Sequence, residues 1–122
     1  MNLDTYLYGR CHIFALALQE ELGYSIELFW DLEAWFDKDG MKIDTALVHA
    51  YCIGSDNVMF DARGRITREV VEEDYEFNEP EILATSPQRL CELMDQGVLE
   101  TLKLGELDSI RAYIRNNLIK YT

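Results

Sequence analysis

One segment constrains the fold more than any other. The twelve residues from Cys11 to Leu22, CHIFALALQEEL, are rich in helix-forming residues, and Gly23 follows where a glycine typically ends a helix. One face of this helix is apolar and consists of Cys11, Phe14, Ala15, Leu18 and Leu22. Most of the remaining surface is apolar too, because of Ile13, Leu16 and Ala17. A helix that is apolar on nearly all sides is buried in the middle of its domain. The rest of the chain must therefore cover it.

The size of the chain fits one such domain. It has 122 residues and a mass of 14.2 kDa, which excludes a two-domain enzyme and predicts a single domain over residues 1–122. There is no internal repeat and there are only two prolines, so no segment is typical of a linker. Hydrophobic residues make up 48% of the chain, enough for an ordinary core, and this excludes general disorder.

The remaining segments predict a sheet and two further helices. Three short segments are rich in β-branched or aromatic residues and are predicted strands: Ser25 to Leu32, Ala46 to Ile53 and Asn57 to Ala62. The polar residues between the last two predict an antiparallel hairpin. Ser86 and Pro87 begin a predicted helix that Gly97 ends, with Leu90, Leu93 and Met94 facing the core and Cys91 also in the core, and a last helix is predicted from Leu107 to Lys120.

These elements together predict an α+β fold. A buried N-terminal helix packs on a small antiparallel sheet, and the two C-terminal helices close the domain. The segment from Trp35 to Asp44 is predicted to be a loop or a lid, and the acidic segment from Glu69 to Glu81 is predicted to be exposed.

The charge of the chain excludes several functions. Its net charge is −12 and its pI is about 4.4, so free nucleic acid and anionic membranes would repel it. Three cysteines cannot all pair within one chain, which indicates a reducing compartment. The N-terminal residues lack the basic region of a signal peptide, and no apolar run is long enough to cross a membrane. We therefore expect a cytoplasmic protein that binds neither nucleic acid nor membranes directly.

Cys11 has the position of a catalytic thiol. The start of a helix lowers a thiol pKa because unsatisfied backbone N–H groups and the helix dipole favour the thiolate. Gly9 would allow the backbone to approach a substrate, the N–H of Cys11 could help to form an oxyanion hole, and Tyr8 or His12 could line the same site. The alternative is a small buried core cysteine.

Two other residues could complete a triad with Cys11. His49 lies within an apolar strand, where an imidazole needs a hydrogen-bond partner, and Asp61 lies on the next strand, opposite or nearly opposite across the hairpin. In such a triad the histidine accepts the thiol proton and returns it to a leaving group, while the aspartate fixes the histidine tautomer. Taken separately, His49 could be a core histidine and Asp61 a turn residue.

The order of these residues resembles a known superfamily. The sequence G-x-C opens an Ala/Leu-rich helix, x-H-A-Y follows on a strand, and x-D-A-x-G follows on the next, so the match runs from Tyr8 to Gly64. This pattern is similar to the papain-like and transglutaminase-like cysteine enzymes, including small bacterial and phage members, and to arylamine N-acetyltransferases. The resemblance implies a reduced papain-like fold and an enzyme without a cofactor whose thiol transfers an acyl group from a protein, a peptide or a small molecule. Peptide or isopeptide cleavage, deamidation, transamidation and acetyl transfer are the reactions that it implies.

Two alternatives use the same residues differently. Cys11, His12, His49 and Cys52 supply the ligand types of a zinc site, although their spacing does not favour one, and we expect no metal. The acidic segment from Glu69 to Glu81 could instead bind a basic partner, such as a nucleic-acid-binding protein, in which case the chain is a non-catalytic binding protein or inhibitor.

Overall fold

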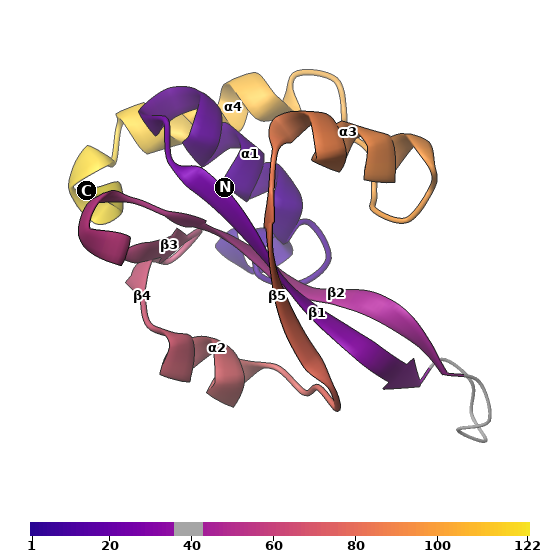
Figure 1. The fold of residues 1–122 in the computed structure, drawn as a ribbon. Coiled ribbons are helices and arrows are strands. Elements are labelled where there is room, and N and C mark those ends of the chain that lie inside the picture. The colour runs from indigo at the N-terminus through magenta and orange to yellow at the C-terminus, as the bar shows by residue number, and fades with distance from the viewer. Residues whose placement is uncertain (36–42) are drawn as a thin grey trace.

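The fold is an α+β domain built on one antiparallel sheet (Figure 1). The computed structural model describes residues 1–35 and 43–122, and side chains are described except in residues 33–44. The sheet has five strands in the order β4-β3-β2-β1-β5. Their bounds are β1 Ser25–Trp35, β2 Ile43–Ile53, β3 Met59–Asp61, β4 Gly64–Ile66 and β5 Pro80–Thr85. The expected α+β class is confirmed.

Helix α1 (Cys11–Leu22) lies at the centre of the domain, as its sequence predicts. Its residues from Cys11 to Leu18 are all buried, and the helix packs between β2 and α4 (Glu106–Arg115). The helix ends at Gly23, which has φ of 74° and donates its backbone N–H to Gln19 O at 2.9 Å. Glycine suits this left-handed position, so the local sequence sets the end of the helix.

The second face of the sheet carries a smaller core. Helix α2 (Arg68–Asp74) covers this face, and its Val71 is buried against Phe29, Tyr51 and Met59. The prediction for the acidic segment is therefore correct only in part. All seven of its acidic side chains are exposed, but the segment also contributes to α2, the start of β5 and several side chains of this core.

The two C-terminal helices lie on the same face as α1 (Figure 1). Helix α3 (Pro87–Asp95) begins as predicted, with Ser86 Oγ accepting the Arg89 N–H at 3.2 Å, and buries Leu90, Leu93 and Met94. The prediction for Cys91 is wrong, because this side chain is exposed.

The last helix is shorter than predicted. Helix α4 ends at Arg115, and a 3₁₀ turn, η3 (Leu118–Tyr121), completes the chain. Leu118, which a continuous helix would place on the same face as the buried Ile114, is 43% exposed, while Tyr121 is fully buried in the core.

The hairpins around β3 shape the edge of the sheet. The predicted turn between β2 and β3 is a short 3₁₀ turn, η2 (Ser55–Asn57), and a second 3₁₀ turn, η1 (Leu3–Tyr6), precedes α1. Gly64, after the β3–β4 turn, has φ of 105°, and a Cβ there would lie 2.7 Å from the Lys120 carbonyl oxygen.

In the predicted lid, Trp35 and residues 43–44 belong to strands, and residues 36–42 lie outside the described residues.

Candidate active site at the start of helix α1

Cys11 is the first residue of α1 and its side chain is only 4% exposed. The chain turns into the helix through Gly9, whose φ is 99°, and Arg10 occupies the N-cap position without a side-chain cap. The first backbone N–H groups of an α-helix have no partner within the helix, and the helix dipole is positive there. Cys11 therefore lies in a position that favours a thiolate. Tyr8, which the sequence predicted to line the site, is 60% exposed.

The sulfur of Cys11 occupies an open edge of strand β2. Strand β3 pairs with β2 only at Cys52 and Ile53, because a two-residue turn after Asp61 takes the chain away. The backbone N–H of Ala50, which β3 does not reach, donates a hydrogen bond to Cys11 Sγ at 3.2 Å. A hydrogen bond to sulfur stabilises the charged form of the thiol.

His49 and Asp61 form a buried pair beside Cys11. Nε2 of His49 is 2.9 Å from Oδ2 of Asp61, and both side chains are almost completely excluded from solvent. Continuing the β2–β3 register places Tyr51 level with Asp61, so His49 reaches the carboxylate diagonally. Diagonal neighbours on one sheet face are within reach of long side chains. The structure thus brings together the two residues that the sequence singled out.

The Asp61 bond determines which nitrogen of His49 is available. With Nε2–H donating to the carboxylate, Nδ1 remains, and it makes no hydrogen bond of normal geometry to any residue that the structure describes. Cys11 and His49 are nevertheless close enough to change each other's pKa. Contacts between a nucleophile and its base are often long before substrate binds. When His49 is neutral, Nδ1 is therefore the nitrogen that can accept the proton of the Cys11 thiol.

The pKa values of Cys11 and His49 move in opposite directions. Burial raises the pKa of the Cys11 thiol, but its interactions with the His12 and His49 side chains, the charge of His49 and the Ala50 N–H outweigh burial and lower the pKa to about 6. Burial lowers the pKa of His49, but the bond to Asp61 and the nearby sulfur raise it to about 9. Between these values the favoured state is a thiolate beside an imidazolium.

Arg63 holds the carboxylate of Asp61 from the turn that follows it. Its backbone N–H donates to Asp61 Oδ1 at 2.8 Å, its guanidinium donates to Oδ2 at 2.7 Å, and it also forms an ion pair with Asp74 on α2. Burial alone would raise the pKa of Asp61. The interactions with His49 and Arg63 outweigh burial, so the pKa of this carboxyl lies below its ordinary value. Asp61 is therefore an ionised acceptor that can fix His49.

Tyr75 is a neighbour of the site that the sequence did not indicate. Its ring stacks on the imidazole of His49, and its hydroxyl donates to Leu7 O at 2.7 Å. Tyr8 packs against the same ring, with centroids 5.5 Å apart. Tyr75 follows α2 within the acidic segment, where no motif marks it. Only the packing of α2 on the second face of the sheet brings it to His49.

His12 holds the segment that faces the nucleophile. Its buried side chain is 2.8 Å, through Nε2, from the carbonyl oxygen of Glu100. Arg10, two residues earlier, is also buried and bonds to the carboxylates of Glu100 and Glu106 and to Thr101 O at 2.8 Å. The residues on either side of Cys11 therefore attach the 98–106 segment to the start of α1.

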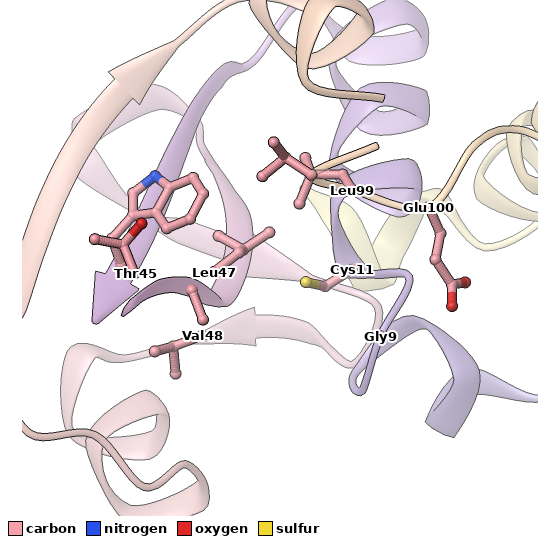
Figure 2. A pocket seen from close by; sticks show the side chains of 10 residues that line it. Gly9, Cys11, Thr45, Leu47, Val48, Leu99 and Glu100 are labelled. Carbon is pink, nitrogen blue, oxygen red and sulfur yellow. The ribbon is translucent and has the colours of Figure 1, made fainter. Parts of the chain in front are cut away.

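A pocket of about 270 Å³ opens onto the sulfur of Cys11. Its walls come from the start of α1, strands β1 and β2 and the segment after α3: Gly9, Cys11, Trp30, residues 45–48 and residues 98–100. Figure 2 shows the sulfur on the pocket side of the helix start, whereas the Glu100 carboxylate points away from it. The lining is mostly apolar. The sequence indicated Gly9 and Cys11 here, but not residues 45–48 or residues 98–100.

An irregularity in the sheet helps to form this pocket. Phe29 pairs with His49 and Trp30 pairs with Leu47, so Val48 has no partner on β1. Such a bulge interrupts the alternation of side chains and often re-aims them beside active sites. Leu47 therefore packs with the core around α1, whereas Val48 packs with the core on the other face.

The remaining thiols lie apart from this site. Cys52 is buried, donates its S–H to Ala15 O at 3.2 Å, and has a raised pKa because of burial, whereas Cys91 is exposed on α3. In the part of the chain that the structure describes, no three His, Cys, Asp or Glu side chains are arranged to hold a metal ion. Among the same residues, no helix has both the length and the apolar character needed to cross a bilayer.

Comparison of the chain with protein families, with curated proteins and with solved structures found no match. The interpretation of the site therefore depends on its own geometry.

Proposed function

We propose that this protein is a cysteine-dependent acyl-transfer enzyme or hydrolase, of the peptidase, deamidase or transamidase type. Cys11 is the nucleophile, His49 the general base and acid, and Asp61 the residue that orients His49. One observation carries the proposal: a buried His49–Asp61 hydrogen bond of 2.9 Å lies beside a thiol at a helix start that faces a pocket. The resemblance to papain-like and transglutaminase-like enzymes supports the same chemistry.

The reaction follows from the charges in the site. The Cys11 thiolate attacks the acyl carbon of the substrate, and the backbone N–H of Cys11 stabilises the negative charge that develops on the carbonyl oxygen. The imidazolium of His49 donates its Nδ1 proton to the leaving group as the carbon–leaving-group bond breaks, which yields a thioester. His49 then removes a proton from water or an amine, which attacks the thioester and regenerates the thiolate. Asp61 stabilises the imidazolium throughout.

Alkylation of the three thiols tests this proposal. Iodoacetamide labelling between pH 5 and pH 10, read by mass spectrometry of the cysteine peptides, reports the thiolate fraction of each residue, with the exposed Cys91 as an accessible control. We expect the Cys11 rate to reach half its maximum near pH 6. In His49→Ala and His49→Gln the midpoint should move up toward the roughly 8.5 of a free thiol.

The outcome is decided by comparison of the variants. Circular dichroism establishes that each variant is folded. An alkylation midpoint of Cys11 that is the same with and without His49, in folded protein, would contradict the proposal. A thiol nucleophile also requires a reducing environment, which agrees with the expected cytoplasmic location.

The exposed carboxylates of residues 69–81 favour a second candidate function. Six of these seven carboxylates have no ion pair among the described residues, and the seventh, that of Asp74, is paired with Arg63. An acidic surface of this kind can bind a basic partner by charge complementarity. In this alternative the chain is a non-catalytic binding protein or inhibitor.

A basic probe tests this alternative separately from catalysis. Binding of poly-lysine by calorimetry should weaken with added salt, should survive Cys11→Ala, and should weaken when Glu72, Glu73 and Glu76 are changed to Gln. A matched triple variant in which the exposed Asp56, Asp95 and Asp108 are changed to Asn controls for net charge alone. Equal binding by the two triple variants would count against a specific role of the acidic segment.

A further inference from the structure

The pocket beside Cys11 has the composition of a site for an uncharged apolar group. Trp30, Leu47 and Leu99 form much of its wall, and Val98, which is 52% exposed, lies at its rim. The carboxylate of Glu100 is engaged by Arg10 at 2.7 Å and points away from the sulfur (Figure 2). A carboxylate placed in this pocket would meet no described basic side chain in its lining.

The pocket walls are held in place from several directions. Trp30 and Leu47 are paired across β1 and β2, next to the bulge at Val48. The Leu99 wall is attached to α1 through the contact of His12 with the Glu100 carbonyl oxygen and the bonds of Arg10 to Glu100 and Thr101. A pocket fixed in this way loses little freedom when a ligand binds.

We infer that this pocket binds the acyl side of the substrate and selects an uncharged, apolar acyl group. This inference rests on the proposed function. Because Sγ of Cys11 is on the pocket wall, a substrate whose acyl chain fills the pocket presents its carbonyl carbon at the sulfur. The leaving group then lies toward solvent and His49. Burial of each methylene in the pocket lowers the barrier to acylation.

A series of 4-nitrophenyl esters tests this assignment. In each reaction the Cys11 thiolate forms a bond to the acyl carbon, the carbon–oxygen bond breaks, and 4-nitrophenolate leaves with the electron pair. Its absorbance gives the rate, and mass spectrometry locates the acyl group. From acetate through propionate and butyrate to valerate, we expect kcat/KM for acylation to rise about fourfold per methylene until the pocket is full. The glutarate monoester matches valerate in chain length but carries a carboxylate. Its kcat/KM should be lower than that of valerate by about tenfold or more.

Matched variants test whether the pocket is the source of the selectivity for apolar acyl groups. Leu47→Phe fills the pocket and should abolish the preference for valerate over acetate. Val98→Asp puts a charge at the rim and should reduce this preference, whereas Ile82→Asp, at a comparably exposed apolar residue on β5, should not. Circular dichroism shows that all three variants are folded, and the rate of iodoacetamide alkylation of Cys11 should stay at the wild-type value in Ile82→Asp, which lies outside the pocket.

The two proposals fail in different ways. The apolar acyl site is overturned if Cys11 is acylated at the same rate by all the neutral esters, or if the glutarate monoester reacts as fast as valerate. Either result would leave the role of Cys11 as the nucleophile intact. Absence of acylation by any ester, with alkylation of Cys11 at low pH retained, also overturns the acyl site. Loss of both acylation and low-pH alkylation overturns the proposed function itself.

Discussion

The ring of Tyr75 lies nearly parallel to the imidazole of His49, with 4.7 Å between the ring centroids and 24° between the planes. The hydroxyl group of the same tyrosine donates to the carbonyl oxygen of Leu7, four residues before Cys11. One side chain therefore sets the plane of the base and anchors the loop that leads to the nucleophile.

This double role can be separated by two substitutions of Tyr75. Tyr75→Phe removes only the hydrogen bond to Leu7 O, and we expect a loss of about 1 kcal/mol in the free energy of unfolding with an unchanged alkylation midpoint for Cys11. Tyr75→Ala also removes the ring, and we expect a loss of about 2–3 kcal/mol, since the side chain is half-buried, together with slower alkylation at pH 7. Urea unfolding and alkylation measure these effects. Wild-type alkylation in Tyr75→Ala would exclude a positioning role for the ring.

Asp61→Asn should weaken both the fold and the nucleophile. The carboxylate raises the pKa of His49, so its loss lowers that pKa, depletes the imidazolium and raises the alkylation midpoint of Cys11. Loss of a buried charged acceptor should also lower the free energy of unfolding by about 1.5–3 kcal/mol. Asp74→Asn is the control, because Asp74 bonds to the same Arg63 from an exposed position, and its effect should stay within about 0.5 kcal/mol. Equal effects of the two substitutions would contradict the assignment.

The pH dependence of acylation should differ with the leaving group. Below about pH 6 the Cys11 thiolate is protonated, so the rate falls for every substrate. Above about pH 9 His49 has lost the proton that an amine leaving group requires, whereas 4-nitrophenolate leaves without one. A 4-nitroanilide should therefore give a bell-shaped profile of kcat/KM, and the ester of the same acyl group a profile with a low-pH limb only. A high-pH limb of equal size in both would argue against His49 as the general acid.

Glu106 should stabilise the fold in a pH-dependent way. Burial raises the pKa of this carboxyl, but Arg10, the Lys103 N–H and Tyr6 outweigh burial and lower the pKa to about 2. A lowered pKa in the folded state gives stabilisation that is complete above the ordinary value near 4.3 and is lost as the pH falls through about 2. Glu106→Gln should thus cost about 1.5–3 kcal/mol at pH 7, and its difference from the wild type should shrink below pH 4.

Thermal unfolding at pH 7 and at pH 2.5 measures this change. Asp108→Asn serves as the control, since Asp108 lies in the same first turn of α4 and is exposed. A difference between Glu106→Gln and the wild type that is as large at pH 2.5 as at pH 7 would show that the carboxylate charge is not the cause.

The sequence predicts those features that local chemistry determines. The bounds of α1 follow from its apolar residues and Gly23, and the start of α3 follows from Ser86 and Pro87. The sequence also predicts the pairing of His49 with Asp61, because a short hairpin brings together residues on both sides of its turn. In each case the interacting residues are close in sequence or a turn connects them.

The features that the sequence did not predict depend on distant packing. Tyr75 and the pocket wall at residues 98–100 reach the site only through the assembled fold, so no local pattern marks them. The buried Leu90, Leu93 and Met94 of α3 are three and four residues apart and share one helix face, whereas Cys91 points about 100° away from Leu90 and lies outside that face. β5 is an edge strand with mostly exposed side chains and lacks the hydrophobic pattern that identifies a strand.

The short length of β3 has a consequence for how this sheet could change. The Ala50 N–H that bonds to Cys11 Sγ lies two residues beyond the last β2–β3 pair, so pairing extended by two residues would compete with the sulfur for the same hydrogen atom. Extending the strand would add a backbone bond to the sheet while removing a donor from the thiolate. Gains in the stability of this edge and in the reactivity of Cys11 are therefore opposed, and selection for one acts against the other.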